Sequence, residues 1–322
     1  MSKTLNIKDK IKKFNASVKV DGDKSLSIRW VLLASQAIGK SRGYNLLMSE
    51  DVLAALDSIK KLGIKVKVCK NYCEVFGNGV NGFKYKKNIE INARNSGTLG
   101  RLILGLLIKS PKKIKLIGDK SLSKRDFSRV TLPLQKFGAK FYFKTKNKLP
   151  LSILGSQSVN GIKYLENKGS AQCKSSVMLA ALNASGTTYI KAKKSRNHSE
   201  LLFKYLKIPI KIRKTKKYDF INIKQPKKIK AFNYQIPGDI SSSAFFMVLT
   251  TLTKNSKLLI KNVNINPSRT GVITILKKMG AKILLKNQRN YRGEKISDIL
   301  IKSSNNLKAI NCPSKLNSSA ID

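Results

Sequence analysis

A stretch of small polar residues followed by an apolar run recurs four times along the chain. The four occurrences are D-G-D-K-S-L-S-I-R-W-V-L-L-A (21–34), N-S-G-T-L-G-R-L-I-L-G-L-L (95–107), G-S-A-Q-C-K-S-S-V-M-L-A-A-L (169–182) and P-G-D-I-S-S-S-A-F-F-M-V-L (237–249). Aligned on Ser25, Ser96, Ser170 and Ser241, they lie 71, 74 and 71 residues apart. A helix that is apolar nearly all round is buried. Each run therefore predicts a buried helix that begins at its polar residues.

A second pattern, a helical run that usually ends in Gly and leads into a Lys-studded strand, recurs with nearly the same period. It reads S-I-K-K-L-G-I-K-V-K-V (58–68), L-Q-K-F-G-A-K-F-Y-F (134–143), F-K-Y-L-K-I-P-I-K-I (203–212) and L-K-K-M-G-A-K-I-L-L (276–285). Apolar residues three and four apart, such as Val52, Leu56 and Ile59, predict a surface helix with one apolar stripe. The glycines at positions 63, 138 and 280 suit a left-handed C-cap.

Together the two patterns define a unit of about 70 residues, of the βαβαβ type, with one inner and one outer helix. Stacked units bury their inner helices together, with the sheets around them. We therefore expect an α/β fold of repeated units. The most basic segment (211–230) is interpreted as a solvated hairpin and connector, with a nucleic-acid contact as the alternative. It ends just before the fourth cycle and indicates a domain boundary near residue 235.

Composition limits the protein class. The chain has 322 residues, of which 41% are hydrophobic, and this suffices for about two domains. No apolar run approaches the roughly 20 residues of a membrane helix, and the N-terminus lacks the apolar region of a signal peptide. We expect a cytoplasmic protein with no membrane partner. With one histidine, His198, and no C-x-x-C pair, no metal is expected. The cysteines are interpreted as free thiols, with a redox pair at Cys69 and Cys73 as the alternative.

The net charge of +48 invites a nucleic-acid function, but the distribution of charge argues against it. The 65 basic residues comprise 54 lysines, spread through nearly every segment, and only 11 arginines. Arginine holds planar oxyanions in a bidentate fork, which lysine cannot do. Six arginines fall inside or beside distinctive motifs: Arg29, Arg101, Arg125, Arg129, Arg196 and Arg269. The arginines are therefore the better guide to function.

Helix N-termini attract anions, because they carry free N–H groups and the positive end of the helix dipole. If the inner helices are parallel, their starts converge into a concave site for a polyanion. The side chains at these starts are Lys24, Ser25, Arg29, Ser96, Thr98, Ser170, Gln172 and Lys174. The alternative is that the hydroxyl and carboxyl groups are only N-caps. Proton transfer would need a carboxylate, and the sequence does not rank the four candidates Asp23, Asp119, Asp239 and Asp322.

At these residues the chain resembles the EPSP synthase family, from about residue 13 to its last residue. D-G-D-K-S-L-S-I-R is similar to the family's P-G-D-K-S-x-S-x-R, and N-S-G-T-L-G-R to N-[AS]-G-T-x-x-R. Five further motifs follow in family order: G-D-x-S-L-S-x-R, S-A-Q-x-K-S, S-R-x-H-[ST]-E, P-G-D-I-S-S-[AS]-A-F-F and N-x-x-x-N-P-x-R-T-G. Each motif is weak to moderate alone, but seven in order are highly specific.

The resemblance implies the enolpyruvyl transferase fold, two domains built from βαβαββ units with buried parallel helices. It implies a first domain over 21–234, with three units on the shikimate 3-phosphate side. The second domain would comprise 1–20 plus 235–322, with one full unit and the start of another. The implied reaction transfers the enolpyruvyl group of phosphoenolpyruvate to the 5-hydroxyl of shikimate 3-phosphate. It passes through a tetrahedral adduct and releases phosphate. No cofactor and no metal are implied, and we expect a monomer.

The resemblance also implies a set of site residues. Shikimate 3-phosphate would be held by Lys24, Ser25, Arg29, Ser170, Ala171, Gln172, Arg196 and Asp322. Phosphoenolpyruvate would be held by Lys24, Gly97, Arg125 and Gln172. Lys24 and Asp322 would be catalytic, with Asp322 contacting the reacting hydroxyl. Gly97 leaves space beside phosphoenolpyruvate, which implies sensitivity to glyphosate.

The chain departs from the family pattern in several places. Asp21, Arg94 and Asp126 replace the usual Pro, Gly and Pro. The final S-S-A-I-D (318–322) resembles the start of a fifth unit, so the family's later catalytic Glu and its later Arg and Lys ligands would be absent. We therefore expect a fragment or truncated product, weakly active or inactive alone, with exposed apolar surface on the second domain.

Three other interpretations stay open at this point. The UDP-N-acetylglucosamine enolpyruvyltransferase family has the same architecture, but usually carries A-K-N where this chain has D-K-S (23–25). A basic RNA- or DNA-binding protein would show affinity that falls steeply with salt. A non-catalytic remnant would bind shikimate 3-phosphate through the first domain alone.

Overall fold

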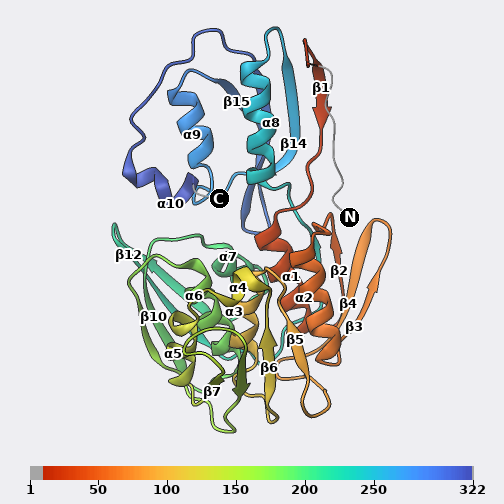
Figure 1. Cartoon of the computed structure of the whole chain (residues 1–322), viewed down its shortest axis with the longest axis vertical. Helices are drawn as coiled ribbons and strands as arrows, with labels where there is room; N and C mark the ends of the chain where they lie inside the picture. The colour runs from red at the N-terminus through yellow and green to blue at the C-terminus, as the bar shows by residue number, and fades with distance from the viewer. Residues whose placement is uncertain (1–9, 321–322) are drawn as a thin grey trace. The chain divides into compact units, whose positions relative to one another are not determined.

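The computed structural model describes residues 10–320. The chain divides into two compact units, which are described separately. The large unit is Gly22–Ile236, and the small unit comprises the described residues up to Asp21 and from Pro237 onward. Their elements are labelled in Figure 1. Among the described residues, the helices are too short or too polar to cross a membrane.

The large unit repeats one module three times: an inner helix, a strand, an outer helix and a hairpin. The first module contains α1 (Lys24–Ser35), β2 (Ile38–Tyr44), α2 (Glu50–Lys61), β3 (Lys65–Val68) and β4 (Tyr72–Asn78). The second contains α3 (Gly97–Leu106), β6 (Ile114–Ile117), α4 (Lys120–Ser123), α5 (Ser128–Gln135), β7 (Lys140–Phe143) and β8 (Leu151–Leu154). The third contains α6 (Ala171–Ala180), a 3-10 turn (Ala181–Asn183), β10 (Thr187–Lys193), α7 (His198–Tyr205), β11 (Ile210–Lys214) and β12 (Tyr218–Lys224).

Each module's sheet is completed by a short edge strand that runs parallel to the module's first strand. These edge strands are β5 (Glu90–Asn92), β9 (Lys163–Glu166) and β13 (Asn233–Gln235). The three sheets have the orders β13-β2-β4-β3, β5-β6-β8-β7 and β9-β10-β12-β11. The last strand of the large unit, β13, pairs with β2, the first strand of that unit. This pairing connects the end of the large unit to its beginning. The repeated α/β unit predicted from the sequence period is confirmed.

The three inner helices α1, α3 and α6 form the core of the large unit, with the sheets around them (Figure 1). Every residue of α1 from Leu26 to Ser35 is buried, as its apolar sequence predicts. The backbones of α3 and α6 approach closely, because a Cβ atom on Gly105 would lie 2.2 Å from the backbone oxygen of Ser176. Small residues at this crossing therefore fix how the starts of the two helices are placed.

The outer helices end as predicted. Gly63, Gly138 and Gly280 have φ angles of 84°, 95° and 100°, so each supplies the left-handed residue after its helix. In the third module Lys207 takes this conformation at 55° in place of a glycine. The strands that follow these residues carry exposed lysines, such as Lys65 and Lys67 of β3 and Lys211 of β11.

The small unit contains one further module of the same kind. Its elements are α8 (Ile240–Leu252), β14 (Lys257–Asn264), α9 (Gly271–Lys278), β15 (Lys282–Tyr291), β16 (Glu294–Lys302), a 3-10 turn (Ser314–Leu316) and α10 (Asn317–Ala320). The strand β1 (Asn15–Val18) pairs in parallel with β14, and the sheet order is β1-β14-β16-β15. This order is the same as in the other three modules.

Helix α8 differs from the inner helices of the large unit. We predicted a buried helix, but Phe245 is 80% exposed and Leu252 is 65% exposed. Only the opposite face, with Ile240 and Met247, enters the core. The reason is that α1, α3 and α6 cover one another, whereas the described part of the small unit has one helix of this type. The exposed apolar surface expected on the second domain lies on α8.

Candidate active site

The starts of the three inner helices are fixed by side-chain caps. Asp23, Ser96 and Ser170 accept hydrogen bonds from the backbone N–H groups of Leu26, Leu99 and Cys173. Capping satisfies one of the first N–H groups of each helix and leaves the positive end of the dipole in place. Most of the side chains predicted as anion ligands therefore stand at defined helix starts. Lys174 is the exception, because it is fully buried and pairs with Glu200 at 2.6 Å.

A hydrogen-bond bridge joins the start of α3 to the start of α6. Arg101 Nη1 donates to Gln172 Oε1 at 2.7 Å, and Gln172 Nε2 donates to Thr98 Oγ1 at 3.0 Å. Ser176 Oγ also donates to the backbone oxygen of Arg101 at 2.9 Å. Residues of α3 thus set the orientation of the Gln172 amide. A ligand that contacts Gln172 would therefore be coupled to α3 as well as to α6.

Gly97 lies between two guanidinium groups. A Cβ atom at this position would be 2.9 Å from both Arg101 Nη1 and Arg125 Nη1. Arg125 Nη2 donates to Asn95 Oδ1 at 3.3 Å, and Asn95 Nδ2 donates to Asp119 Oδ2 at 2.6 Å. The first turn of α3 therefore presents a position without a side chain, beside two cationic groups.

The charge of Arg101 is disfavoured by its surroundings. Burial lowers the pKa of Arg101, and the positive charges of Arg125 and Arg129 lower it further, against the opposing effects of Cys173 and Asp126. The guanidinium also lies over the ring of Phe127, 5.3 Å from its centroid. An anion bound near these arginines would relieve this repulsion. The cluster is therefore suited to a phosphate or carboxylate.

Arg29 is held inside the large unit by two other elements. Its side chain is 4% exposed. Arg29 Nε donates to Ser199 Oγ at 2.8 Å, and Nη2 donates to Ser175 Oγ at 3.1 Å. Nη1 donates to the backbone oxygen of Ser25 at 3.0 Å. Arg29 thus connects α1 to α6 and α7, and at the same time fixes the carbonyl of a predicted ligand residue.

Lys24 and Arg196 are more accessible than Arg29. The Lys24 ammonium forms an ion pair with Asp51 at 3.2 Å, and its side chain is 49% exposed. The pair with Asp51 is partly exposed, and ion pairs of this kind contribute little to stability. Arg196 is half-buried and lies two residues before α7, whose N-cap is Asn197.

The loop before α6 is shaped by a buried carboxylate. Glu166, which is 4% exposed, accepts hydrogen bonds from the backbone N–H groups of Lys168 at 3.1 Å and Gly169 at 2.7 Å. Gly169 has a φ angle of 72°, a conformation that favours glycine. These contacts direct the chain into Ser170 and the half-buried Ala171.

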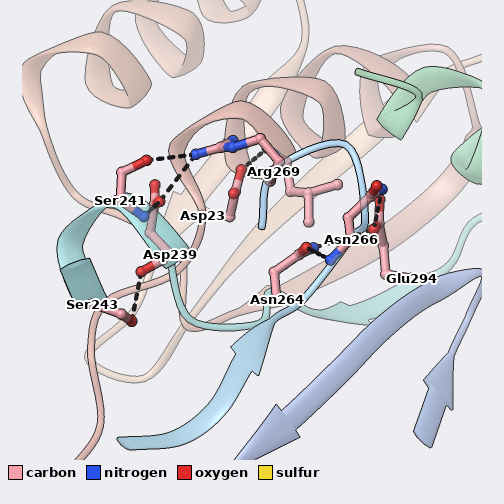
Figure 2. A network of polar contacts seen from close by, with 9 residues as sticks. Asp23, Asp239, Ser241, Ser243, Asn264, Asn266, Arg269 and Glu294 are labelled. Atoms are coloured by element: carbon pink, nitrogen blue, oxygen red, sulfur yellow. Dashed lines mark hydrogen bonds and ion pairs between the residues drawn. The ribbon is translucent and has the colours of Figure 1, made fainter. Parts of the chain in front are cut away.

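The carboxylates considered in the sequence have different roles in the structure. Asp23, Asp119 and Asp239 are N-caps of α1, α4 and α8. Asp239 also accepts a hydrogen bond from Arg269 Nη2 at 3.3 Å, and both residues are labelled in Figure 2. Asp322 lies outside the described residues, so its catalytic role stays a prediction.

Two residues that shape the candidate site were not assigned by the sequence. Arg101 was noted as an arginine in a distinctive motif but was given no role, although it contacts Gln172 and borders Gly97. Glu166 was not singled out at all. The spacing of Arg101, four residues after Gly97 on the same helix, is the signal that could have found it. No local pattern identifies Glu166.

Comparison with known proteins decides the family. The family model for EPSP synthase (3-phosphoshikimate 1-carboxyvinyltransferase) matches residues 8–314. The chain belongs to the EPSP synthase family. The 3-phosphoshikimate 1-carboxyvinyltransferase of Ruthia magnifica subsp. Calyptogena magnifica is 42% identical over 306 residues, which are 95% of this chain and 69% of that protein. The enzyme of Petrotoga mobilis is 38% identical over 293 residues, 90% of this chain and 67% of that protein.

A solved structure agrees with this assignment. EPSP synthase from Acinetobacter baumannii superposes with a TM-score of 0.86 at 35% sequence identity, covering 96% of this chain and 70% of that chain. The fold and the family expected from the motifs are therefore confirmed. The chain is a transferase of the EPSP synthase family, and it spans about two thirds of the length of these relatives.

Proposed function

We propose that the large unit of this chain binds both substrates of the family's reaction at the starts of its inner helices. The reaction is the transfer of the enolpyruvyl group from phosphoenolpyruvate to the 5-hydroxyl of shikimate 3-phosphate, with release of phosphate. The observation that carries the assignment is the bridge from Arg101 through Gln172 to Thr98. It joins the helix start assigned to one substrate with the helix start assigned to the other.

Shikimate 3-phosphate is assigned to the starts of α1 and α6 and the loop before α7. Its phosphate and carboxylate suit helix N-termini, where free N–H groups and the dipole favour negative charge. The proposed ligands are Lys24, Ser25, Arg29, Ser170, Ala171, Gln172 and Arg196. Their support is that Arg29 bonds to residues of α6 and α7, so that all three elements belong to one hydrogen-bonded assembly.

Phosphoenolpyruvate is assigned to the start of α3. Gly97 has no side chain to exclude a ligand, and Arg101 and Arg125 supply two guanidinium groups beside it. Guanidinium groups bind carboxylates and phosphates through paired hydrogen bonds. Lys24 and Gln172 are proposed to reach this substrate as well. We extend the proposal to glyphosate, which would compete for the same position.

Catalysis is proposed to rest on Lys24 together with Asp322. Lys24 is exposed, and its weak ion pair with Asp51 leaves the ammonium able to approach a bound phosphoenolpyruvate. Asp322 is assigned to the reacting hydroxyl from the family resemblance. The chain is further proposed to act as a monomer in the cytoplasm.

Titration with shikimate 3-phosphate tests the proposal. The thermal midpoint should rise by about 5 °C or more at a ligand concentration of about 100 times Kd, because binding stabilises the folded state by about 2.7 kcal/mol at that ratio. Trp30, the single tryptophan, follows Arg29 and offers a fluorescence readout.

Two variants sharpen the test. Arg29→Ala should abolish the shift in thermal midpoint. Arg42→Ala should keep it, because Arg42 pairs with Glu74 at 2.8 Å on the sheet of the first module. The absence of any shift in the unaltered chain at millimolar ligand would refute the proposed site.

A further inference from the structure

Two charged side chains lie against each other inside the large unit. Lys174 of α6 has no exposed surface, and Glu200 of α7 is 3% exposed. Lys174 Nζ lies 2.6 Å from Glu200 Oε1. Within the part of the chain that the structure describes, no group makes an aligned hydrogen bond to Lys174 Nζ or to either Glu200 oxygen. The ion pair is therefore the polar contact that each charge makes.

A pair of this kind is a poor source of stability. Taking an ammonium and a carboxylate out of water is costly, and their attraction compensates only when further hydrogen bonds satisfy both groups. Those hydrogen bonds are not formed by the described residues. Well-packed apolar residues in place of a buried ion pair are often neutral or stabilising. A role in placing neighbouring groups explains this pair better than a role in stability.

On each of the two helices, the charged residue of the ion pair comes about one helical turn after a proposed ligand. Lys174 comes one helical turn after Ser170 and two residues after Gln172 on α6. Glu200 is in the first turn of α7, four residues after Arg196. The pair therefore joins the two elements that present the proposed shikimate 3-phosphate ligands of the third module.

The sequence neighbours of the two charged residues hold Arg29. Ser175, next to Lys174, and Ser199, next to Glu200, both accept hydrogen bonds from the Arg29 guanidinium. The two hydroxyls also bond to each other at 2.7 Å. A shift of α7 relative to α6 would separate these hydroxyls and release the guanidinium. The ion pair thus favours the same alignment of α7 with α6 that places both hydroxyls within hydrogen-bond distance of Arg29.

We propose that Lys174 and Glu200 are positioning residues for shikimate 3-phosphate binding, which lock the first turn of α7 onto α6. This inference rests on the proposed function. An apolar pair would hold the helices together without fixing their register, because the hydrophobic effect is non-directional. Two opposite charges at 2.6 Å restrict sliding, because their attraction weakens as they separate.

The test replaces both charges together, as Lys174→Met with Glu200→Leu. This double variant should melt at or above the temperature of the unaltered chain but bind shikimate 3-phosphate at least tenfold more weakly by calorimetry. The amide of Leu201, which bonds to the Asn197 oxygen at 3.1 Å, should exchange hydrogen faster. Single replacements are expected to lower the melting temperature, because each leaves one buried charge alone.

A charge-swapped variant, Lys174→Glu with Glu200→Lys, restores an ion pair and should recover the dissociation constant to within about threefold of the unaltered value. Arg42→Met with Glu74→Leu is the matched control, since it removes an ion pair of the same unit from a sheet. It should leave shikimate 3-phosphate binding unchanged.

Two results would overturn the inference. The first is unchanged shikimate 3-phosphate affinity in the double variant at normal stability. The second is a loss of affinity that only follows a loss of stability and is not recovered by the charge swap. Absence of binding by the unaltered chain would instead defeat the proposed function, and this inference with it, so the two failures are distinguishable.

Discussion

Helix α3 carries three glycines whose replacement by alanine should have three different effects. The informative change is Gly97→Ala at the first helical residue, where the added Cβ would lie 2.9 Å from Arg101 Nη1 and from Arg125 Nη1. Ordinary contacts of a Cβ atom begin at 3.4 Å, so each guanidinium must move by about 0.5 Å, the difference between 3.4 and 2.9. Both groups are the ends of flexible side chains, so the backbone can stay in place.

The magnitude follows from what the guanidinium groups are proposed to do. A hydrogen bond to a charged group is worth about 1.5–3 kcal/mol. Misplacement of one or both arginines should cost about that much in phosphoenolpyruvate affinity, which is a factor of about 10 to 100. The thermal midpoint should change little, because the two clashing atoms are the far ends of flexible side chains.

The other two glycines provide matched controls on the same helix. At Gly100 a Cβ would meet Ala93 and Phe127 at 3.5 Å, an ordinary contact. Gly100→Ala should therefore raise stability slightly and leave ligand affinity unchanged. At Gly105 a Cβ would lie 2.2 Å from the backbone oxygen of Ser176. Gly105→Ala should force α3 away from α6 and lower the thermal midpoint strongly.

Calorimetric titration of phosphoenolpyruvate in the presence of shikimate 3-phosphate measures the effect, and a thermal melt of each variant accompanies it. Glyphosate titrated in the same way should lose affinity in Gly97→Ala along with phosphoenolpyruvate. The reasoning is refuted if Gly97→Ala binds phosphoenolpyruvate within twofold of the unaltered chain. It is equally refuted if Gly100→Ala weakens binding as much as Gly97→Ala does.

Two further predictions concern Arg101 and Cys73. Arg101→Lys should weaken phosphoenolpyruvate binding about tenfold by calorimetry, because a lysine lacks the planar fork that reaches Gln172 while stacking on Phe127; unchanged affinity would contradict this. Burial raises the pKa of Cys73 from 9.0 to about 12, so the folded state favours the neutral thiol. The contribution of this thiol to stability is therefore present below pH 9 and is lost as the pH rises toward 12. Urea denaturation across that range should show the unaltered chain losing stability relative to Cys73→Val, and parallel curves would count against the assignment.

The repeated architecture could be predicted from the sequence because each unit is specified by local patterns that recur along the chain. Period and polarity indicated the inner helices, and glycine indicated the ends of the outer helices at Gly63, Gly138 and Gly280. The four sheets of identical order follow from the same repetition. The partial exposure of α8 could not be predicted in this way. The apolar sequence of a helix shows which faces can be buried, but the elements packed against the helix determine which faces are buried.

The site was predicted less completely than the fold. The positions of the proposed ligands at helix starts follow from the motifs, but their side-chain partners depend on the crossing of α3 with α6. The bridge from Arg101 to Gln172 joins residues 71 positions apart, so no local spacing reveals it. The burial of Arg29 by Ser175 and Ser199 depends on packing among three elements in the same way.

The starts of α8 and α3 differ in the charge that the nearby arginines meet. At the start of α8, Arg269 donates to Asp239 and to Ser241, and the ion pair is almost fully buried. The cation of that start is therefore neutralised by its own capping carboxylate. At the start of α3 the cap is Ser96, which carries no charge.

Within the described residues, Arg101 and Arg125 beside the start of α3 form no ion pair with a carboxylate at 4.0 Å or less. Replacing a carboxylate cap by a hydroxyl cap thus leaves positive charge beside Gly97. A phosphorylated carboxylate would supply the negative charge that Asp239 supplies to Arg269. Ser96→Asp should therefore behave as an internal competitor, which weakens phosphoenolpyruvate binding while the cap of α3 stays intact.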